Sequence, residues 1–189
     1  KRLRPYFRPF RDENEVLDSI SIDRPRFLSF PAIFKSLDGV FMALSVLPML
    51  WKRKDEFDII DAHFAYPDGL AACLLGKLLN KKVVITLRGT EVPHAKKWLL
   101  RLQLKMVFRW ADRIFSVSDS LRRHAIELGC DPDKTRVIGN GVDTDKFHPL
   151  SKQECRQQLQ LTAEQPVMVS VGALVERKGF HRVLNLMPS

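Results

Sequence analysis

The feature that most constrains the fold of this chain is a regular alternation of short β-rich runs with helical patterns. Runs rich in β-branched and aromatic residues predict strands at residues 57–63, 83–87, 113–117, 136–138 and 167–171. Between the first two runs, apolar residues recur at the spacing of a helix with one buried face, namely at Ala71, Leu74, Leu75 and Leu78. Repeated strand–helix–strand units predict an α/β fold, with a parallel sheet and helices on both of its faces. The ligand site of such a sheet lies at the carboxyl ends of its strands.

The segment before the last predicted strand divides the chain into domains. Residues 139–149 are predicted to form a long loop, and the capping box Ser151-Lys152-Gln153-Glu154 then begins a short helix. We interpret this stretch as an interdomain connection. The sequence therefore predicts a Rossmann-like domain at residues 1–150, a connection at 151–165, and the first strand and helix of a second Rossmann-like domain at 166–189.

The charge balance favours anionic partners. With 31 Lys and Arg against 22 Asp and Glu, the formal net charge is +9, which suits nucleic acid, phosphorylated substrates or an acidic membrane surface without choosing among them. The three cysteines lack the spacing of a zinc site or a disulfide framework, which indicates a reducing cytoplasm. The apolar run at residues 39–51 is too short to span a bilayer, and no signal-peptide pattern begins the sequence.

The first polar motif lies where the first predicted strand gives way to a helix. It reads Asp61-Ala62-His63-Phe64-Ala65-Tyr66-Pro67-Asp68-Gly69. The imidazole of His63 can exchange a proton or hydrogen-bond a hydroxyl near neutral pH. The alternative is structural, with His63 closing the strand and Asp68 capping the helix. The spacing alone leaves both interpretations open.

The second motif, Arg88-Gly89-Thr90-Glu91, follows the next predicted strand. Its glycine lets a ligand approach the backbone amides, and Arg88 supplies a cation for a phosphate or carboxylate. The same residues also suit a plain surface ion pair between Arg88 and Glu91.

The third motif is a glycine turn between the last predicted strand and the helix after it, running from Gly172 through Arg177 and Lys178 to Gly179. A strand-to-helix turn with adjacent cations can hold a diphosphate, because helix amides and the dipole favour anions. The turn lacks the spacing of a Walker A loop, and no G-x-G-x-x-G fingerprint occurs in the chain. Triphosphate hydrolysis and dinucleotide redox chemistry are therefore disfavoured.

Taken in order, these motifs resemble family 4 glycosyltransferases of the GT-B fold. The resemblance runs from about Phe57 to Met187, and it includes the Asn140-Gly141-Val142-Asp143 signature with Phe147 downstream. It implies two Rossmann-like domains facing a cleft, with a nucleotide-sugar bound mainly by the second and an acceptor by the first. It also implies transfer with retention of configuration and without a bound metal or other cofactor.

The resemblance assigns roles to individual residues. His63 matches the histidine beside the transferred sugar and is the expected catalytic residue. Lys178, with Arg177 and Gly172, is expected to hold the donor diphosphate, on which negative charge grows as the glycosidic bond breaks. Four residues of the loop after the second strand, together with Asp68, are expected to face the acceptor cleft: Arg88, Gly89, Thr90 and Glu91. Asn140 and Gly141 are expected to form the hinge.

The sequence departs from the family pattern at several places. Arg88 stands where many members have histidine, Ala173 where many have arginine, and Gly139 where proline is common. We expect the family's glycine-containing first strand-loop before residue 1, and its Glu-x7-Glu motif after residue 189. On this interpretation the chain is a fragment that is inactive by itself.

Two other classes of function remain as alternatives. A basic nucleic-acid-binding module is suggested by residues 1–8, where cations and aromatic rings alternate, but such a module leaves the strand-end motifs unexplained, so no nucleic-acid partner is expected. A noncatalytic GT-B relative is the other. For the enzyme we expect a lipid-linked or cell-surface glycan as acceptor. We also expect peripheral binding to the cytoplasmic membrane face through residues 40–50 and the basic cluster at 51–54.

Overall fold

The computed structural model describes residues 14–17, 20–29, 34–162 and 166–186. It divides into two compact units, Lys1–Asn140 and Gly141–Ser189, and each is described by itself. The division falls between the two residues predicted to form the hinge. The basic segment at residues 1–8, on which the nucleic-acid alternative depends, lies outside the described residues.

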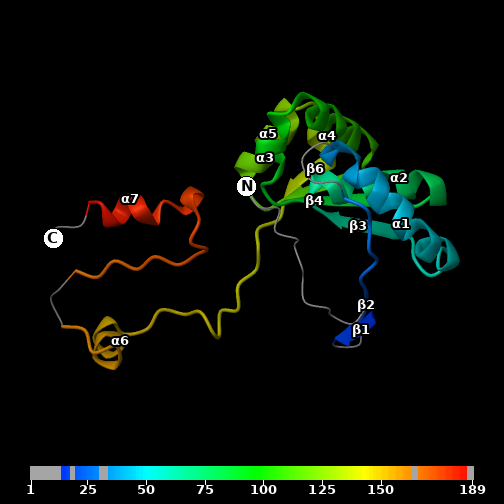
Figure 1. The fold of residues 1–189 in the computed structure, drawn as a ribbon. Helices are drawn as coiled ribbons and strands as arrows, with labels where there is room; N and C mark the ends of the chain where they lie inside the picture. The colour runs from blue at the N-terminus through cyan, green and yellow to red at the C-terminus, as the bar shows by residue number, and fades with distance from the viewer. Residues whose placement is uncertain (1–13, 18–19, 30–33, 163–165, 187–189) are drawn as a thin grey trace. The chain divides into compact units, whose positions relative to one another are not determined.

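A four-stranded parallel sheet organises the first unit (Figure 1). Its strands lie in chain order: β3 (Ile59–His63), β4 (Lys82–Leu87), β5 (Arg113–Ser116) and β6 (Thr135–Val137). The pairing is in register, so that Ala62 lies beside Ile85 and Ile85 beside Ile114. The predicted α/β fold and its parallel sheet are confirmed, because each of the four strands predicted for this region forms and pairs with the next.

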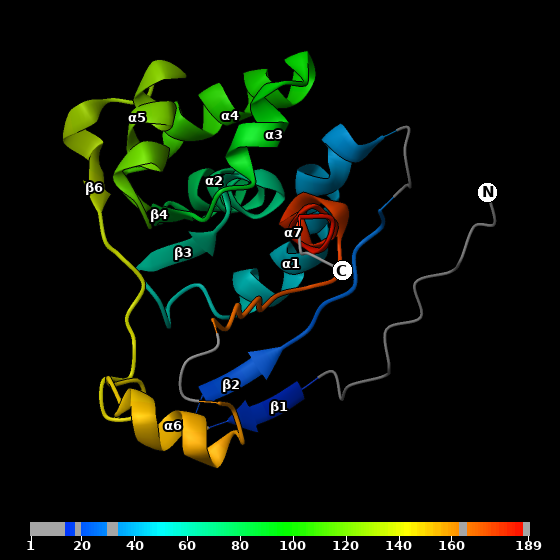
Figure 2. The same cartoon turned by 90° about the vertical axis from the view of Figure 1, so that its left-hand side faces the viewer.

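Five α-helices accompany the sheet, and buried side chains of three of them, α2, α4 and α5, join the strands in the core. They are α1 (Asp38–Lys52), α2 (Leu70–Leu79), α3 (Glu91–Ala95), α4 (Trp98–Trp110) and α5 (Asp119–Glu127). Figure 2 shows α2, α4 and α5 on one side of β3 and β4. The core joins Ala62, Ile85 and Ile114 of the strands to buried residues of these helices, including Leu104. A second cluster joins α1 to α2 through Ala43, Ala71 and Leu75.

The opposite face of the sheet is more open. The strand residues that alternate with the buried ones are exposed or only half-buried, including Asp61, His63, Val84 and Thr86. Since successive side chains of a strand point to opposite faces, these residues lie away from the core. The predicted cover of the sheet by helices is confirmed on the face that α2, α4 and α5 occupy.

The residues before α1 form elements that the sequence pattern does not predict. Strands β1 (Asn14–Leu17) and β2 (Ile20–Asp23) pair as an antiparallel hairpin. Arg53, just after α1, lies 3.4 Å from the Asp23 carboxylate and 2.8 Å from that of Glu56. Helix α1 continues through Pro48.

The second unit contains two short helices, α6 (Lys152–Gln158) and α7 (Phe180–Leu184). The predicted capping box is present on one side, since the Glu154 amide donates to the Ser151 hydroxyl at 3.4 Å. The strand predicted at residues 167–171 is wrong: no strand is assigned there, and Val169 and Val171 are 77% and 89% exposed. A parallel strand exists only when another strand accepts its hydrogen bonds, and the described residues of this unit contain no such partner.

Candidate active site

His63 ends β3 on the open face of the sheet, and the loop after β4 lies beside it. Parallel pairing places His63 next to Thr86, so Arg88 follows at the same edge of the sheet. Arg88 Nε donates to His63 Nδ1 at 3.0 Å. On the other side of the ring, His63 Nε2 lies 3.6 Å from Asp61 Oδ2. The geometry therefore assigns the ring proton to Nε2, with a cation at one nitrogen and a carboxylate at the other.

This environment suits a group that interacts with a bound hydroxyl. The His63 side chain is 49% exposed and the Asp61 side chain 56% exposed, so both can reach a ligand. The sequence interpretation omitted Asp61 from the site. A signal for it was present, because residues i and i+2 of a strand point to the same face.

The buried carboxylate of Glu91 links the segment after β3 to the loop after β4. It is 1% exposed, and its two carboxyl oxygens accept from the backbone amides of Ala65 at 3.0 Å and Gly89 at 2.8 Å. Gly89 has a φ of 106°, a conformation that side chains with a Cβ rarely adopt. Glu91 was expected to face the acceptor cleft, but its carboxyl group is buried and bonded to the two loops. Glu91 therefore fixes the backbone at Ala65 and Gly89, next to His63 and Arg88.

Thr90 and Asp68, which were also expected to face the acceptor cleft, lie in two different segments. Thr90 precedes α3, and its hydroxyl oxygen is buried with no hydrogen-bond partner among the described residues. Asp68 lies in the turn between β3 and α2, where burial raises the pKa of its carboxyl group above the usual value. A hydrogen bond from its own backbone amide and the charge of nearby His63 oppose this shift.

A hollow of about 370 Å³ opens beside these groups. Its polar side is formed by Asp61, His63 and Asp68, and its apolar wall includes Met42 and Val46 of α1. Pattern reasoning did not assign α1 to the site, because its contribution depends on how it packs against α2. The combination of an apolar wall and a few polar groups is typical of a small-molecule site.

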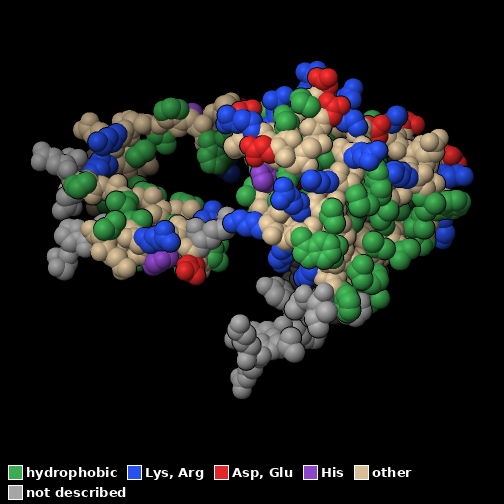
Figure 3. All heavy atoms as spheres, turned by 90° about the horizontal axis from the view of Figure 1, so that it is seen from above, with side chains coloured by type: hydrophobic (Ala, Val, Ile, Leu, Met, Phe, Trp, Pro, Cys, Tyr) green, Lys and Arg blue, Asp and Glu red, His purple; other side chains and the backbone are tan. Residues whose placement is uncertain are grey.

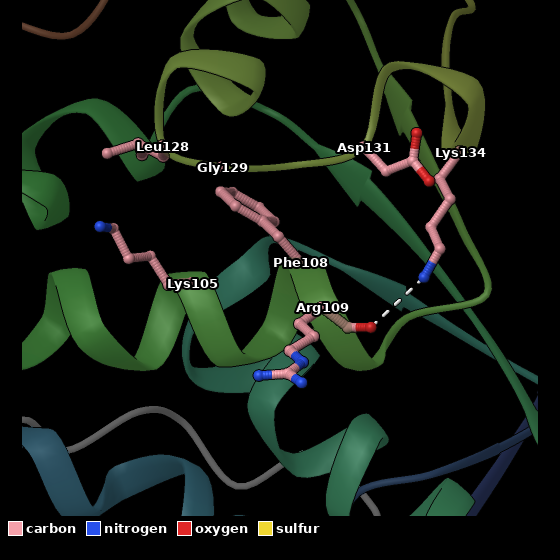
Figure 4. A pocket seen from close by; sticks show the side chains of 7 residues that line it. All are labelled: Lys105, Phe108, Arg109, Leu128, Gly129, Asp131 and Lys134. Carbon is pink, nitrogen blue, oxygen red and sulfur yellow. Dashed lines mark hydrogen bonds between the residues drawn. The ribbon is translucent and has the colours of Figure 1, made fainter.

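A larger cavity of about 430 Å³ lies between α4 and residues 128–134, the segment that leads into β6. Figure 4 shows that its cations do not converge: Lys105 and Arg109 point away from each other. The ammonium group of Lys134 donates to the carbonyl oxygens of Arg109 and Ala111 at 3.3 and 3.2 Å. The cavity contains none of the predicted site residues, so we do not assign the active site to it.

In the second unit, the predicted diphosphate residues gather around a glycine. A Cβ built on Gly172 would lie 3.7 Å from Lys178 Cδ and 3.4 Å from Phe180 Cζ. The Lys178 amide donates to the Val175 carbonyl at 2.9 Å, which folds the chain into a short 3₁₀ turn, Glu176–Lys178. The structure therefore brings Gly172 and Lys178 together, while the side chain of Arg177 lies outside its described part.

The described residues contain neither a cluster of metal ligands nor a membrane-spanning helix. No group of three or more His, Cys, Asp or Glu side chains there is arranged to hold a metal ion. The helices in the same residues are all too short or too polar to cross a bilayer.

Comparisons with known proteins relate this chain to glycosyltransferases. The model of Glycosyltransferase Family 4 matches residues 6–146. A glycosyltransferase named for teichuronic acid biosynthesis, TuaC of Bacillus subtilis, is 28% identical over 183 residues, which are 95% of this chain and 47% of the relative. UDP-Gal:alpha-D-GlcNAc-diphosphoundecaprenol alpha-1,3-galactosyltransferase of Escherichia coli is 28% identical over 139 residues, 67% of this chain and 34% of the relative.

Among solved structures, sucrose-phosphate synthase from Thermosynechococcus elongatus matches with a TM-score of 0.68 at 16% identity, over 94% of this chain and 46% of that one. At this identity the match shows the fold alone. The chain spans less than half the length of each of these three relatives.

Proposed function

Since this chain belongs to Glycosyltransferase Family 4, we propose that the protein transfers a sugar from a nucleotide-sugar to a glycan or lipid-linked acceptor, with retention of configuration and without a metal. The observation that carries the proposal is the placement of His63 between Arg88 and Asp61 at the carboxyl edge of the parallel sheet. This is the edge at which open α/β sheets bind their ligands.

The chemistry of the site supports this proposal. An exposed imidazole with its ring orientation held by neighbours can contact a sugar hydroxyl and the charge that develops beside it in the transition state. The adjoining hollow has an apolar wall and a polar side, which suits the two faces of a sugar ring. Lys178 beside Gly172 supplies a cation for the leaving diphosphate.

The choice of substrates rests on the relatives' names. The Escherichia coli relative is named for transfer from UDP-Gal to a diphosphoundecaprenol-linked sugar, and the Bacillus subtilis relative for biosynthesis of a cell-surface polymer. We propose a uridine-diphosphate sugar as donor and a lipid-linked glycan as acceptor. A peripheral position on the cytoplasmic face of the membrane follows from such an acceptor.

The test is a transfer assay with the full-length protein, radiolabelled UDP-sugars and a sugar-diphosphate-undecaprenol acceptor, with and without a metal chelator. Transfer that survives chelation and is lost in His63→Ala supports the proposal, and the anomeric configuration of the product is read by NMR. Folded, full-length protein that transfers no sugar from any UDP-sugar would support the noncatalytic alternative.

A further inference from the structure

Helix α4 has an apolar row on its outer side. Trp98, Leu102 and Met106 are 74%, 51% and 39% exposed, whereas Leu104 and Val107 of the same helix are fully buried. Residues four apart on a helix lie one above the other, so the three exposed side chains form one row along the helix. A contiguous apolar row in water indicates a surface that meets another apolar phase.

A row of cations runs beside the apolar row. Lys97, Arg101, Lys105 and Arg109 repeat at the same four-residue spacing, offset by one position, and all four are exposed. Residues 96–110 contain no Asp or Glu. None of these four cations forms an ion pair with a residue that the structure describes, in contrast to Arg123 of α5, which lies 3.3 Å from Asp119.

The space-filling view shows which kinds of side chain lie on this side of the first unit. Figure 3 looks down on the first unit from the side of α3, α4 and α5, and hydrophobic side chains lie there among those of Lys and Arg. Figure 4 shows Lys105 and Arg109 of α4 spread apart on its surface. Spread cations suit an extended anionic surface better than a single phosphate.

Helix α1, the membrane contact expected from the sequence, is less suitable. Several of its apolar side chains pack in a cluster with residues of α2, including Met42, Val46 and Leu50. Apart from Pro48, only Leu44 and Trp51 of its large hydrophobic residues are more than half exposed, at 60% and 52%.

We propose that α4 is the membrane-contacting surface of this protein and lies in the plane of an anionic lipid bilayer. Trp98, Leu102 and Met106 enter the headgroup region, while Arg101, Lys105 and Arg109 lie against the lipid phosphates. An aromatic and aliphatic row bordered by cations is the pattern of a helix that lies on a membrane rather than across it. The inference deepens the proposed function, since it names the surface that brings the site to a lipid-linked acceptor.

The experiment measures binding of the full-length protein to vesicles, without donor or acceptor. Phosphatidylglycerol–phosphatidylcholine vesicles are compared with phosphatidylcholine vesicles by flotation over a salt series. We expect binding only to the anionic vesicles, weakening as salt rises. The charge variant Arg101→Gln/Lys105→Gln/Arg109→Gln should bind at least tenfold more weakly, because each cation near an anionic membrane contributes roughly fivefold in affinity.

A second α4 variant and a matched control make the test specific. Trp98→Gln/Leu102→Gln/Met106→Gln removes the apolar row and should also abolish flotation at moderate salt. Leu44→Gln/Trp51→Gln/Lys52→Gln alters α1 in the same way and should bind like the wild type. All substituted side chains are exposed, and thermal melts of each variant verify folding.

Three outcomes overturn the inference: no binding to anionic vesicles, equal loss in the α1 control, or wild-type binding by both α4 variants. A shift of oligomeric state in the α4 variants, with vesicle binding unchanged, would assign the row to contact between copies. The proposed function fails separately, by absence of sugar transfer in protein that still floats.

Discussion

At the scale of single residues, the candidate site is defined by the charged side chains that flank the imidazole ring of His63. His63 receives a hydrogen bond from Arg88 and faces Asp61, while Lys178 lies beside Gly172 in the other unit. These two settings imply different tasks, because His63 adjoins a hollow with an apolar wall and Lys178 offers an exposed cation.

The division of work can be measured on the full-length enzyme. Lys178→Ala should weaken binding of the nucleotide diphosphate roughly ten- to a hundredfold, because it removes a charge-assisted hydrogen bond of about 1.5 to 3 kcal/mol. His63→Ala should leave that binding nearly unchanged and lower turnover by a larger factor, because in the proposed function its contacts form around the reacting sugar. Calorimetry and single-turnover transfer measure the two effects, and equal loss of nucleotide affinity in both variants would contradict these roles.

Glu91 should matter for stability first and for activity through His63. Glu91→Ala leaves two backbone amides without their acceptor, which should cost about 2 to 4 kcal/mol in the free energy of unfolding. Glu91→Gln should cost less than Glu91→Ala, because an amide oxygen can still accept from one of the two. Urea unfolding gives both values, with Glu154→Ala on exposed α6 as control. A cost below that of the control would show that the two hydrogen bonds do not form.

His94 should make stability depend on pH. Its ring meets Tyr66 edge-on at 5.6 Å, and burial lowers its pKa, with Glu91 opposing and Lys97 adding to the shift. A lowered pKa means that the unfolded chain takes up the proton more readily, so stability is complete above about pH 6.5, falls as the pH drops from there toward the lower folded pKa, and levels off below it. His94→Gln should flatten this fall. Thermal melting over a pH series checks it, and an unchanged slope would refute it.

At the scale of elements, parallel pairing explains why the motifs meet. Consecutive strands end at the same edge, so the turn after β3 and the loop after β4 become neighbours although 25 residues separate His63 from Arg88. Helix α2 follows the turn after β3 and packs against β4. The close approach of α2 to β4 depends on Gly76.

Gly76 is predicted to tolerate no side chain. A Cβ there would lie 2.3 Å from Val83 Cγ2, so Gly76→Ala should destabilise by about 1 to 3 kcal/mol through overpacking, although alanine in a free helix would stabilise. Adding Val83→Ala should recover about 1 kcal/mol or more, seen as coupling in a double-mutant cycle. Gly139→Ala meets nothing within 4 Å and serves as a control. Additive effects of Gly76→Ala and Val83→Ala would contradict the contact.

At the scale of the whole molecule, the chain consists of two units joined by an exposed stretch. Residues 139–150 are all exposed, and Asp143 closes a local turn by accepting from the amides of Asp145 and Lys146. The first unit contains the sheet and its core, whereas the second contains two short helices and no strand in its described residues.

Limited trypsin digestion should reflect this organisation. Cleavage after Lys146 should precede cleavage after Lys77 and Lys134, because backbone in an exposed loop reaches a protease without unfolding of packed structure. Mass spectrometry of the early products identifies the order. First cuts after Lys77 or Lys134 would show that the sheet unit opens more easily than the connecting loop.

The sequence by itself determined the type and order of most elements and the loops that carry polar chemistry. Hydrophobic period, turn residues and caps are local, so the four sheet strands, the α6 cap and the motif at His63 could be predicted from short windows. Only the tertiary structure decided that Glu91 is internal, that Arg88 bonds to His63, and that α1 packs on α2 while α4 keeps an apolar row in water. It also decided that residues 167–171 form no strand. Each of these depends on which distant segments pair or pack, and the free energy of such contacts is absent from any local pattern.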